Sequence, residues 1–236
     1  MQTDLRLFGP AHLAIVASVP ASAAVLSWIT SRHPGSAKAM RFGLAVAVAA
    51  AALSWYAYRF AAEHVQLPQG MPLELCDFSF GLTVFALLTL RRRAFDLAYY
   101  WGVGGAGMAM LTPSITTPLG SFPAVVFFVR HGTVIVSILY LLWTRQARPS
   151  RNSWWFALLV LNACAVLVGI VDYLTGRNYM YLRAKPPTVS LFDLLGPWPW
   201  YLLASEFIAA VIFLLMYWPF RSAAGNRGHR RRSIAA

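Results

Sequence analysis

Seven long apolar runs divide this chain of 236 residues, and they constrain its fold more than any other feature. Within a bilayer a helix satisfies its own backbone hydrogen bonds, and roughly 20 apolar residues span the hydrocarbon core. Only 12% of the residues are charged and 58% are hydrophobic, which is typical of a membrane protein and not of a soluble domain. We therefore predict an all-α, polytopic membrane protein, a bundle of about seven transmembrane helices. The predicted spans are residues 11–30, 41–60, 74–90, 94–111, 122–143, 154–174 and 198–219.

The first apolar run has a second interpretation, because Arg6, the run itself and Ala21-Ser22-Ala23 imitate a cleavable signal peptide. However, Asp4 neutralises Arg6, and the run continues through Trp28 before it meets basic residues. We favour an uncleaved span.

The basic residues lie in short clusters between the runs, and their distribution predicts the orientation of the chain. With the N-terminus outside, fourteen lysines and arginines lie on the cytoplasmic side and five on the external side, a strong positive-inside bias. We predict an N-out, C-in multi-pass protein of the cell membrane, with a transmembrane domain over residues 1–220 and a basic, disordered cytoplasmic tail over residues 221–236. The cytoplasmic clusters are Arg32, Lys38 and Arg41; Arg91 to Arg93; Arg145, Arg148 and Arg151; and Arg221 to Arg232.

The net charge of +12 does not indicate a nucleic-acid partner, because the basic residues form no continuous binding face. Their placement at the ends of apolar runs suits contact with anionic lipid. The expected partner is membrane phospholipid, and no pattern in the chain indicates an oligomeric state.

Small residues recur in the fourth run, where Gly102 and Ala106, and likewise Gly105 and Ala109, are four positions apart. This spacing allows helix backbones to approach closely, so we interpret it as a packing surface. No strand precedes these glycines, which makes a nucleotide-binding loop a poor fit.

Polar side chains near the spans, apart from the cytoplasmic clusters, gather toward the predicted external ends. Ionisable groups at membrane depth usually face a bundle interior or a wet cavity, so we predict one polar pocket that opens outward. The alternative is a set of separate buried ion pairs, such as Arg130 with Glu206 or Asp172. The residues concerned are Cys76, Asp77, Arg130, His131, Asp172, Asn178, Tyr179, Tyr181, Lys185, Asp193, Tyr201 and Glu206.

A possible nucleophile and base occur among these residues. Cys76 lies in "MPLELCDF", just after Pro72, where a helix should begin, and a helix N-terminus favours the reactive thiolate. His131 is the only histidine deep inside a predicted span, and a neutral imidazole can act as a base toward a thiol. Cys76 is expected near the interface and His131 roughly 12–14 Å into its span. The two meet only if the segment containing the prolines dips inward or the spans are offset.

Other uses of the same residues are less well supported. Cys76, Asp77, His131 and Glu206 include no pair with the i, i+3 or i, i+4 spacing of helical metal ligands, so we predict no metal and no cofactor. Cys164 lies among alanine, valine and leucine and is interpreted as packing. Because the two cysteines belong to different runs, a disulfide is not expected.

Several ordered motifs run along the chain. They are "LP" at 67–68, "MPLELCDFS" at 71–79, "YYWGVGGAGMAMLTP" at 99–113, "FFVRHG" at 127–132, "NYMYLRAKP" at 178–186 and "LLGPWPWYLLASE" at 194–206. Through these motifs the chain resembles the YwaF-like bacterial integral membrane protein family over roughly residues 10 to 220. The eukaryotic relatives of that family are the transmembrane protein 164 acyltransferases, and the androgen-induced-protein lipid hydrolases are more distant.

The resemblance implies a bundle of about seven helices. For the eukaryotic branch it implies acyl transfer between phospholipids through a membrane cysteine, which matches Cys76, with His131 as the matching histidine. The family commonly has histidine at the position of Glu74, so this chain departs from the pattern there.

Together these observations predict a membrane-embedded lipid acyltransferase or lipid hydrolase with a Cys76–His131 dyad. The alternative is a non-enzymatic seven-helix binding protein, either a receptor or a small-molecule carrier, which would tolerate serine at position 76. The expected supporting roles are orientation of His131 by Asp172 or Glu206, binding of lipid phosphate by Arg130 or Lys185, and hydrogen bonds to an oxyanion from Asn178, Tyr181 and Tyr201.

Overall fold

The computed structural model describes residues 5–113, 115–187 and 190–221. The described part of the chain is 75% helical and contains no strand, so the all-α class is confirmed. Within these ranges, five helices are long and apolar enough to cross a membrane. They are α1 (Pro10–Arg32), α2 (Ala37–Ala61, preceded by the 3-10 turn η1, Pro34–Ser36), α6 (Phe122–Trp143), α7 (Ser153–Thr175) and α8 (Trp200–Tyr217, followed by the 3-10 turn η5, Trp218–Phe220). The predicted tail lies outside the described residues except for Arg221.

The other two predicted spans have a different form. The run at 74–90 is the helix α3 (Leu75–Thr89), whose 15 residues fall short of the roughly 20 needed to cross a bilayer without distortion. The run at 94–111 is a continuous helical segment made of α4 (Arg92–Leu97), the π-helix η2 (Ala98–Ala106) and α5 (Gly107–Leu111). Five membrane-length helices are therefore present among the described residues, and the total of seven spans remains a proposal.

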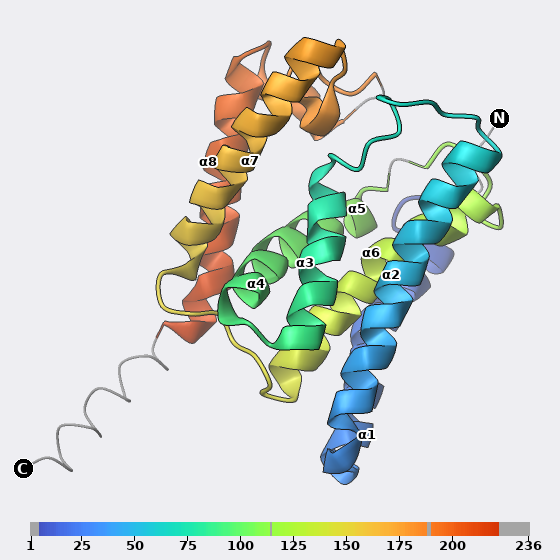
Figure 1. The fold of residues 1–236 in the computed structure, drawn as a ribbon, viewed down its shortest axis with the longest axis vertical. Coiled ribbons are helices and arrows are strands. Elements are labelled where there is room, and N and C mark those ends of the chain that lie inside the picture. The colour runs from blue at the N-terminus through green and yellow to red at the C-terminus, as the bar shows by residue number, and fades with distance from the viewer. Residues whose placement is uncertain (1–4, 114, 188–189, 222–236) are drawn as a thin grey trace, which may run out of the picture.

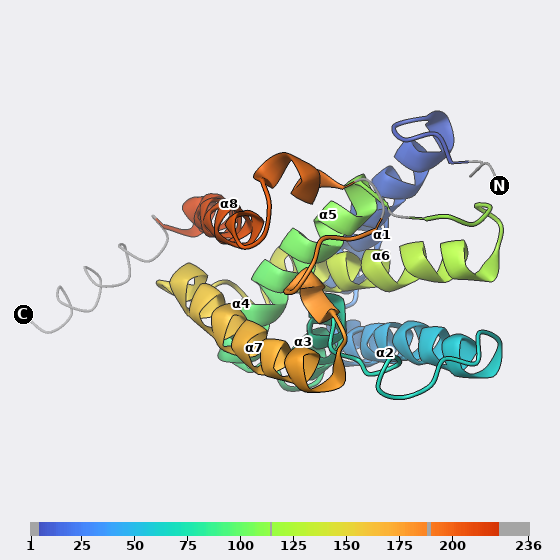
Figure 2. The ribbon, with the colours of Figure 1, turned by 90° about the horizontal axis from the view of Figure 1, so that it is seen from above.

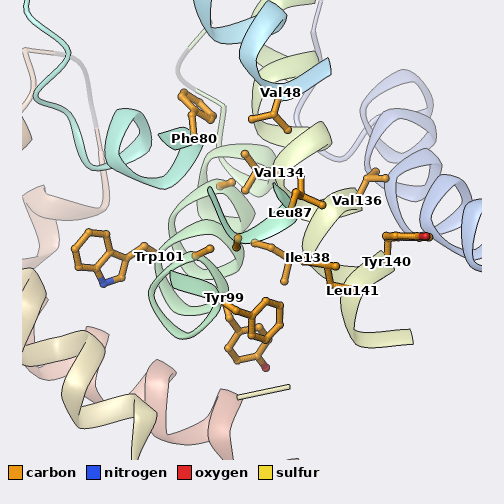
Figure 3. Close-up of a cluster of buried hydrophobic side chains, with 14 of the residues drawn as sticks. Val48, Phe80, Leu87, Tyr99, Trp101, Val134, Val136, Ile138, Tyr140 and Leu141 are labelled. Carbon is orange, nitrogen blue, oxygen red and sulfur yellow. The ribbon is translucent and has the colours of Figure 1, made fainter. Parts of the chain in front are cut away.

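The helices form two groups with α3, α4 and α5 between them. Figures 1 and 2 show α1, α2 and α6 on one side and the α7–α8 pair on the other. The most buried of the five long helices is α6: 61% of its apolar stretch is buried, against 17% to 22% in the others. Its side chains Val134, Ile138 and Leu141 belong to the main hydrophobic core, together with Val48 and Leu87 (Figure 3).

Small residues let η2 approach α6 closely, as the spacing in the sequence predicted. A Cβ atom at Gly102 would lie 2.6 Å from Cδ1 of Ile138 and 2.8 Å from Cγ1 of Val134, so only glycine fits without displacing these side chains. The predicted packing role is confirmed at this position.

Three consecutive aromatic residues of η2 hold the α7–α8 pair to the rest of the bundle. The Tyr99 hydroxyl donates to the carbonyl of Met216 at 3.0 Å, Tyr100 bonds the Ser153 hydroxyl at 2.9 Å, and the Trp101 indole donates to the carbonyl of Ala157 at 3.1 Å. Each side chain fills space with its ring and satisfies its polar atom across the interface. The π-helix thereby fixes the position of both α7 and α8.

We propose the N-out, C-in orientation from the charge distribution, and single-cysteine labelling can test it. Leu194→Cys, at a side chain 82% exposed in the segment before α8, should react with a membrane-impermeant maleimide in intact cells. Gly35→Cys, in the turn between α1 and α2 with nothing near its Cβ position, should react only after permeabilisation. Both changes belong in a chain lacking Cys76 and Cys164, and labelling of both from the same side would contradict the topology.

Candidate active site

Cys76 lies at the second residue of α3, and local interactions explain why the helix begins there. Pro72 restricts the chain before it, and Glu74 occupies the N-cap position in an extended conformation. Glu74 and Asp77 form a capping box, in which the Asp77 carboxylate accepts the Glu74 backbone N–H at 3.1 Å. These interactions place the thiol in the first turn, near the positive end of the helix dipole.

The loop after α2 brings Cys76 down to the depth of His131. It crosses the top of the molecule and turns inward, so that α3 begins below the ends of α7 and α8 (Figure 1). Sγ of Cys76 lies 3.4 Å from Nε2 of His131, although the residues are 55 positions apart. The inward path of this loop therefore brings the thiol and the imidazole together.

The surroundings of His131 define which ring nitrogen faces the thiol. Nδ1 lies 2.7 Å from the carbonyl oxygen of Phe127, one helical turn earlier in α6. Because a carbonyl only accepts, Nδ1 carries the proton, and Nε2 of the neutral ring accepts from the Cys76 thiol. The rings of Phe127 and Phe80 pack against the imidazole at centroid distances of 4.5 and 5.8 Å and hold its orientation. The expected orienting partners, Asp172 and Glu206, do not contact His131.

Arg130 pairs with Asp77, and this pair lies immediately beside the thiol in sequence. Nη2 of Arg130 lies 3.6 Å from Oδ1 of Asp77, and both side chains are less than 10% exposed. The guanidinium also lies over the rings of Phe80 and Trp55, at 4.6 and 5.3 Å from their centroids. The alternative pairing of Arg130 with Glu206 or Asp172 is wrong, because α7 and α8 lie on the far side of α3.

Removal of Arg130 should destabilise the protein strongly. Arg130→Met would leave the buried Asp77 carboxylate without its cation, a change that costs about 3 kcal/mol when one partner of a buried pair is lost. The melting temperature of purified protein in detergent measures the effect. Arg93→Met is the matched control: Arg93 is 64% exposed, and its partner Asp96 keeps two hydrogen bonds from Ser150, so this change should alter stability little. Equal losses in the two variants would contradict a structural role for the Arg130–Asp77 pair.

A cavity of about 810 Å³ adjoins Cys76, between η2 and α5 on one side and α8 on the other. This volume is typical of a small-molecule site. Apolar side chains line most of it, and Gly104 and Gly105 also belong to its lining. Cys76 and Glu74 lie on its wall, while His131 stands behind Cys76 and does not line it. Further lining residues include Trp101, Met108, Leu161, Ile208, Ile212 and Phe213.

The segment between α7 and α8 covers one side of this cavity and contains the short helices η3 (Tyr179–Tyr181) and η4 (Leu191–Leu195). Met180 and Tyr181 line the cavity, and both have positive φ angles, 53° and 55°. The Glu74 carboxylate accepts the Met180 N–H at 3.0 Å, which ties this segment to the start of α3. The Tyr201 hydroxyl donates to the Tyr181 carbonyl and connects this segment to α8.

The remaining predicted site residues hold this segment in place. Asp172, fully buried, accepts the Tyr179 N–H at 2.8 Å. Asn178 bonds the backbone of Arg183 and Ala184 within the segment. Nζ of Lys185 lies 3.8 Å from Oδ1 of Asp193. None of Asp172, Asn178, Lys185 and Tyr201 lines the cavity, so the expected convergence of all these residues on one pocket is wrong.

Glu206 is placed away from the cavity altogether. Its carboxylate accepts from the Asn162 side-chain amide at 2.5 Å, across the α7–α8 interface. The neighbouring Ser205, Ile208 and Ala209 face the cavity instead. Because successive helical residues point about 100° apart, a single position decides which face a side chain occupies.

Sequence reasoning did not identify two contributors to the site. The Phe127 carbonyl orients His131, and a backbone group carries no sequence signal beyond its position four residues before the histidine. Glu74 was noted only for its departure from the family pattern, although in the structure it occupies the N-cap position of α3, three residues before Asp77. No group of three His, Cys, Asp or Glu side chains in the described ranges is arranged to hold a metal ion.

The membrane-length helices and the polar contacts buried between them define an integral, polytopic α-helical membrane protein. The model of the TMEM164 family matches residues 7–217, and the chain belongs to that family. The expected relation to the transmembrane protein 164 group is thereby confirmed, and the bacterial YwaF-like grouping stays a prediction. No curated protein and no solved structure matches the chain.

Proposed function

We propose that this protein is a lipid acyltransferase or lipid hydrolase in which Cys76 is the nucleophile and His131 the general base. The observation that carries the proposal is the 3.4 Å contact between Sγ and Nε2 at the wall of a cavity of about 810 Å³. A nucleophile bonded to a base, with the base oriented by a third group, is the arrangement expected for covalent catalysis. Here the third group is the Phe127 carbonyl.

The first half-reaction follows from this geometry. As Sγ of Cys76 attacks the carbonyl carbon of a lipid ester, the thiol proton passes to Nε2 of His131. The tetrahedral intermediate then collapses, the ester C–O bond breaks, and His131 returns the proton to the departing alkoxide. An acyl thioester on Cys76 and a free lipid alcohol remain. Because the Nδ1 proton stays hydrogen-bonded to the Phe127 carbonyl, the imidazole can take up the second proton only at Nε2.

The second half-reaction restores the thiol. His131 removes a proton from an acceptor hydroxyl, the acceptor oxygen attacks the thioester carbonyl, and the thiolate leaves and recovers the proton from Nε2. A lipid alcohol as acceptor gives transfer, and water gives hydrolysis.

The oxyanion of both intermediates requires hydrogen-bond donors, and two of the three side chains expected for this role are engaged elsewhere. Asn178 and Tyr201 donate to backbone carbonyls, whereas Tyr181 lines the cavity and its hydroxyl makes no hydrogen bond among the described residues. The first turn of a helix has N–H groups without intrahelical acceptors, and Cys76 belongs to that turn. We assign the oxyanion to the backbone N–H groups at the start of α3.

The character of the cavity supports a lipid substrate. Its lining is mainly apolar, and it lies among helices whose outer faces are apolar as well. Such a cavity favours an acyl chain through the loss of water-exposed apolar surface, roughly 25 cal/mol per Å². Phospholipid esters are therefore the proposed acyl donors.

Direct detection of the acyl-enzyme tests this proposal. Full-length protein incubated with phospholipid vesicles should gain the mass of a fatty acyl group on the peptide containing Cys76, and neutral hydroxylamine should remove it. The peptide containing Cys164 is the internal control and should stay unmodified. An enzyme that turns over phospholipid without any acylated Cys76 would rule out the covalent mechanism.

The alternative of a non-enzymatic binding protein is favoured by one observation, the mainly apolar lining of the cavity, which a lipid carrier would share. The two functions differ at the thiol. A binder keeps its affinity for lipid in Cys76→Ser and shows no turnover in the unmodified chain.

A further inference from the structure

A second cavity, of about 680 Å³, lies at the other end of the bundle from Cys76. Three parts of the chain meet there: the α3–α4 connection, the α6–α7 loop and the C-terminal end of α8, all at the lower end of Figure 1. Four of its eleven lining residues are arginines. The lining residues are Leu90, Arg92, Phe95, Arg145, Gln146, Ala147, Arg148, Pro149, Arg151, Tyr217 and Phe220.

The positive charge of this cavity is not neutralised by the protein. No acidic residue lines it, and none of its four arginines forms an ion pair with a carboxylate in the described part of the chain. The nearest buried carboxylate, Asp96, already accepts two hydrogen bonds from Ser150 and lies 3.9 Å from Arg93, which is outside the lining. An anion from outside would therefore meet four guanidinium groups without a competing carboxylate.

The backbone that carries three of these arginines is anchored. Oδ1 of Asp96 accepts the Ser150 N–H at 2.8 Å and Oδ2 accepts its hydroxyl at 2.5 Å, so the buried carboxylate holds the end of the α6–α7 loop. At the other end of the loop, the N–H of Gln146 donates to the carbonyl of Leu141 at 3.0 Å. Arg145, Arg148 and Arg151 thus project from a fixed loop, which lowers the entropy lost when they bind a shared ligand.

The cavity combines these arginines with an apolar wall formed by Leu90, Phe95, Tyr217 and Phe220. A guanidinium group binds phosphate through two parallel N–H···O bonds, and the apolar wall suits the glycerol and upper acyl region of a lipid. Basic pockets between helices on the cytoplasmic side of a membrane protein typically bind phospholipid headgroups. The volume also exceeds what a bare phosphate ion requires.

We propose that this cavity is a binding site for a phosphate-bearing ligand, and that the headgroup of an anionic phospholipid in the cytoplasmic leaflet occupies it. The site is separate from Cys76 and His131 and does not depend on the proposed reaction. A bound headgroup would bridge the α6–α7 loop to the end of α8, and so would tie the α7–α8 pair to the core at this end.

The test compares two charge-matched variants of the full-length protein in nanodiscs. Arg145→Gln/Arg148→Gln removes two charges from the cavity. Arg32→Gln/Lys38→Gln removes two charges from the α1–α2 end on the same predicted side, outside the lining. Each protein is placed in phosphatidylcholine alone or with phosphatidylglycerol, and the readouts are the melting temperature and the lipid retained in native mass spectrometry.

Phosphatidylglycerol should raise the melting temperature of the wild type and of the Arg32/Lys38 variant. The cavity variant should lose this shift and retain roughly tenfold less phosphatidylglycerol, as expected when charge-assisted hydrogen bonds are lost. Equal losses of retained phosphatidylglycerol in the two variants, or no loss in either, would mean that the cavity does not bind the headgroup specifically. Either result would overturn the proposed site.

Inorganic phosphate added to the phosphatidylcholine nanodiscs distinguishes the two sources of the ligand. No shift is expected with phosphate, because the apolar wall adds nothing for a bare ion. A shift in the wild type that the cavity variant lacks would overturn the headgroup assignment in favour of a soluble phosphate compound. Should Arg145→Gln/Arg148→Gln fail to fold, Arg145→Lys/Arg148→Lys keeps the positive charge but removes the planar guanidinium groups that bind phosphate through two bonds. Unchanged retention of phosphatidylglycerol in that variant would overturn the site.

Discussion

Cys76→Ala is expected to abolish both the acyl-enzyme and phospholipid turnover, because the sulfur that forms the covalent bond is gone. Cys76→Ser should also fall to near background, since a serine hydroxyl at this position is a much weaker nucleophile than a thiolate. The measurement is release or transfer of a labelled fatty acid from phospholipid vesicles by the purified chain, compared with the hydroxylamine-sensitive mass increase.

Cys164→Ala is the matched control for the loss of a thiol. Both cysteines are free and partly buried, yet Cys164 lies in α7 and makes no hydrogen bond among the described residues. Its substitution should leave turnover unchanged. Full phospholipid turnover in Cys76→Ala would reduce the cysteine to a packing residue and would rule out Cys76 as the nucleophile.

His131→Ala should lower the rate of acyl-enzyme formation by about 10²–10⁴-fold, the usual contribution of a positioned general base. The reason is geometric: Nε2 is the acceptor 3.4 Å from Sγ, and the described residues around the thiol offer no other base in hydrogen-bond contact. The initial rate of Cys76 acylation measures the effect, with the melting temperature recorded beside it.

His12→Ala separates catalysis from stability. His12 is also a fully buried histidine on a long helix, and its Nε2 lies 2.8 Å from the Met110 carbonyl while Nδ1 accepts the Phe8 N–H at 3.0 Å. Its loss should lower the melting temperature and leave the acylation rate of the folded fraction intact. Equal rate losses in the two histidine variants would indicate that His131 acts through the fold and not as a base.

The two halves of the site differ in how firmly they are held. His131 belongs to α6, the most buried long helix, and two aromatic rings fix its ring. Cys76 depends on the start of a short helix, which the capping box and the Arg130–Asp77 pair stabilise. Asp77 therefore serves both its own helix and α6, and its charge is paired with Arg130 although it stands next to the Cys76 thiol.

Local properties of the chain determined the elements. Hydropathy and length predict the five membrane-length helices, because the need to satisfy backbone groups within lipid acts on each run separately. Pro72 predicts a helix start close to Cys76 for the same local reason. The small-residue spacing around Gly102 predicts close packing, though not the partner helix.

Only the tertiary structure decided which side chains meet. The sequence placed Cys76 and His131 at different depths, since it gave no measure of the dip in the loop after α2, and packing brought them to 3.4 Å. Helix rotation turned Glu206 to Asn162 and away from the cavity. The four arginines of the second cavity come from two separate clusters in the sequence, one on each side of α6. Periodicity and hydropathy are properties of single helices, whereas depth, rotation and the cavities between helices arise from how the helices pack together.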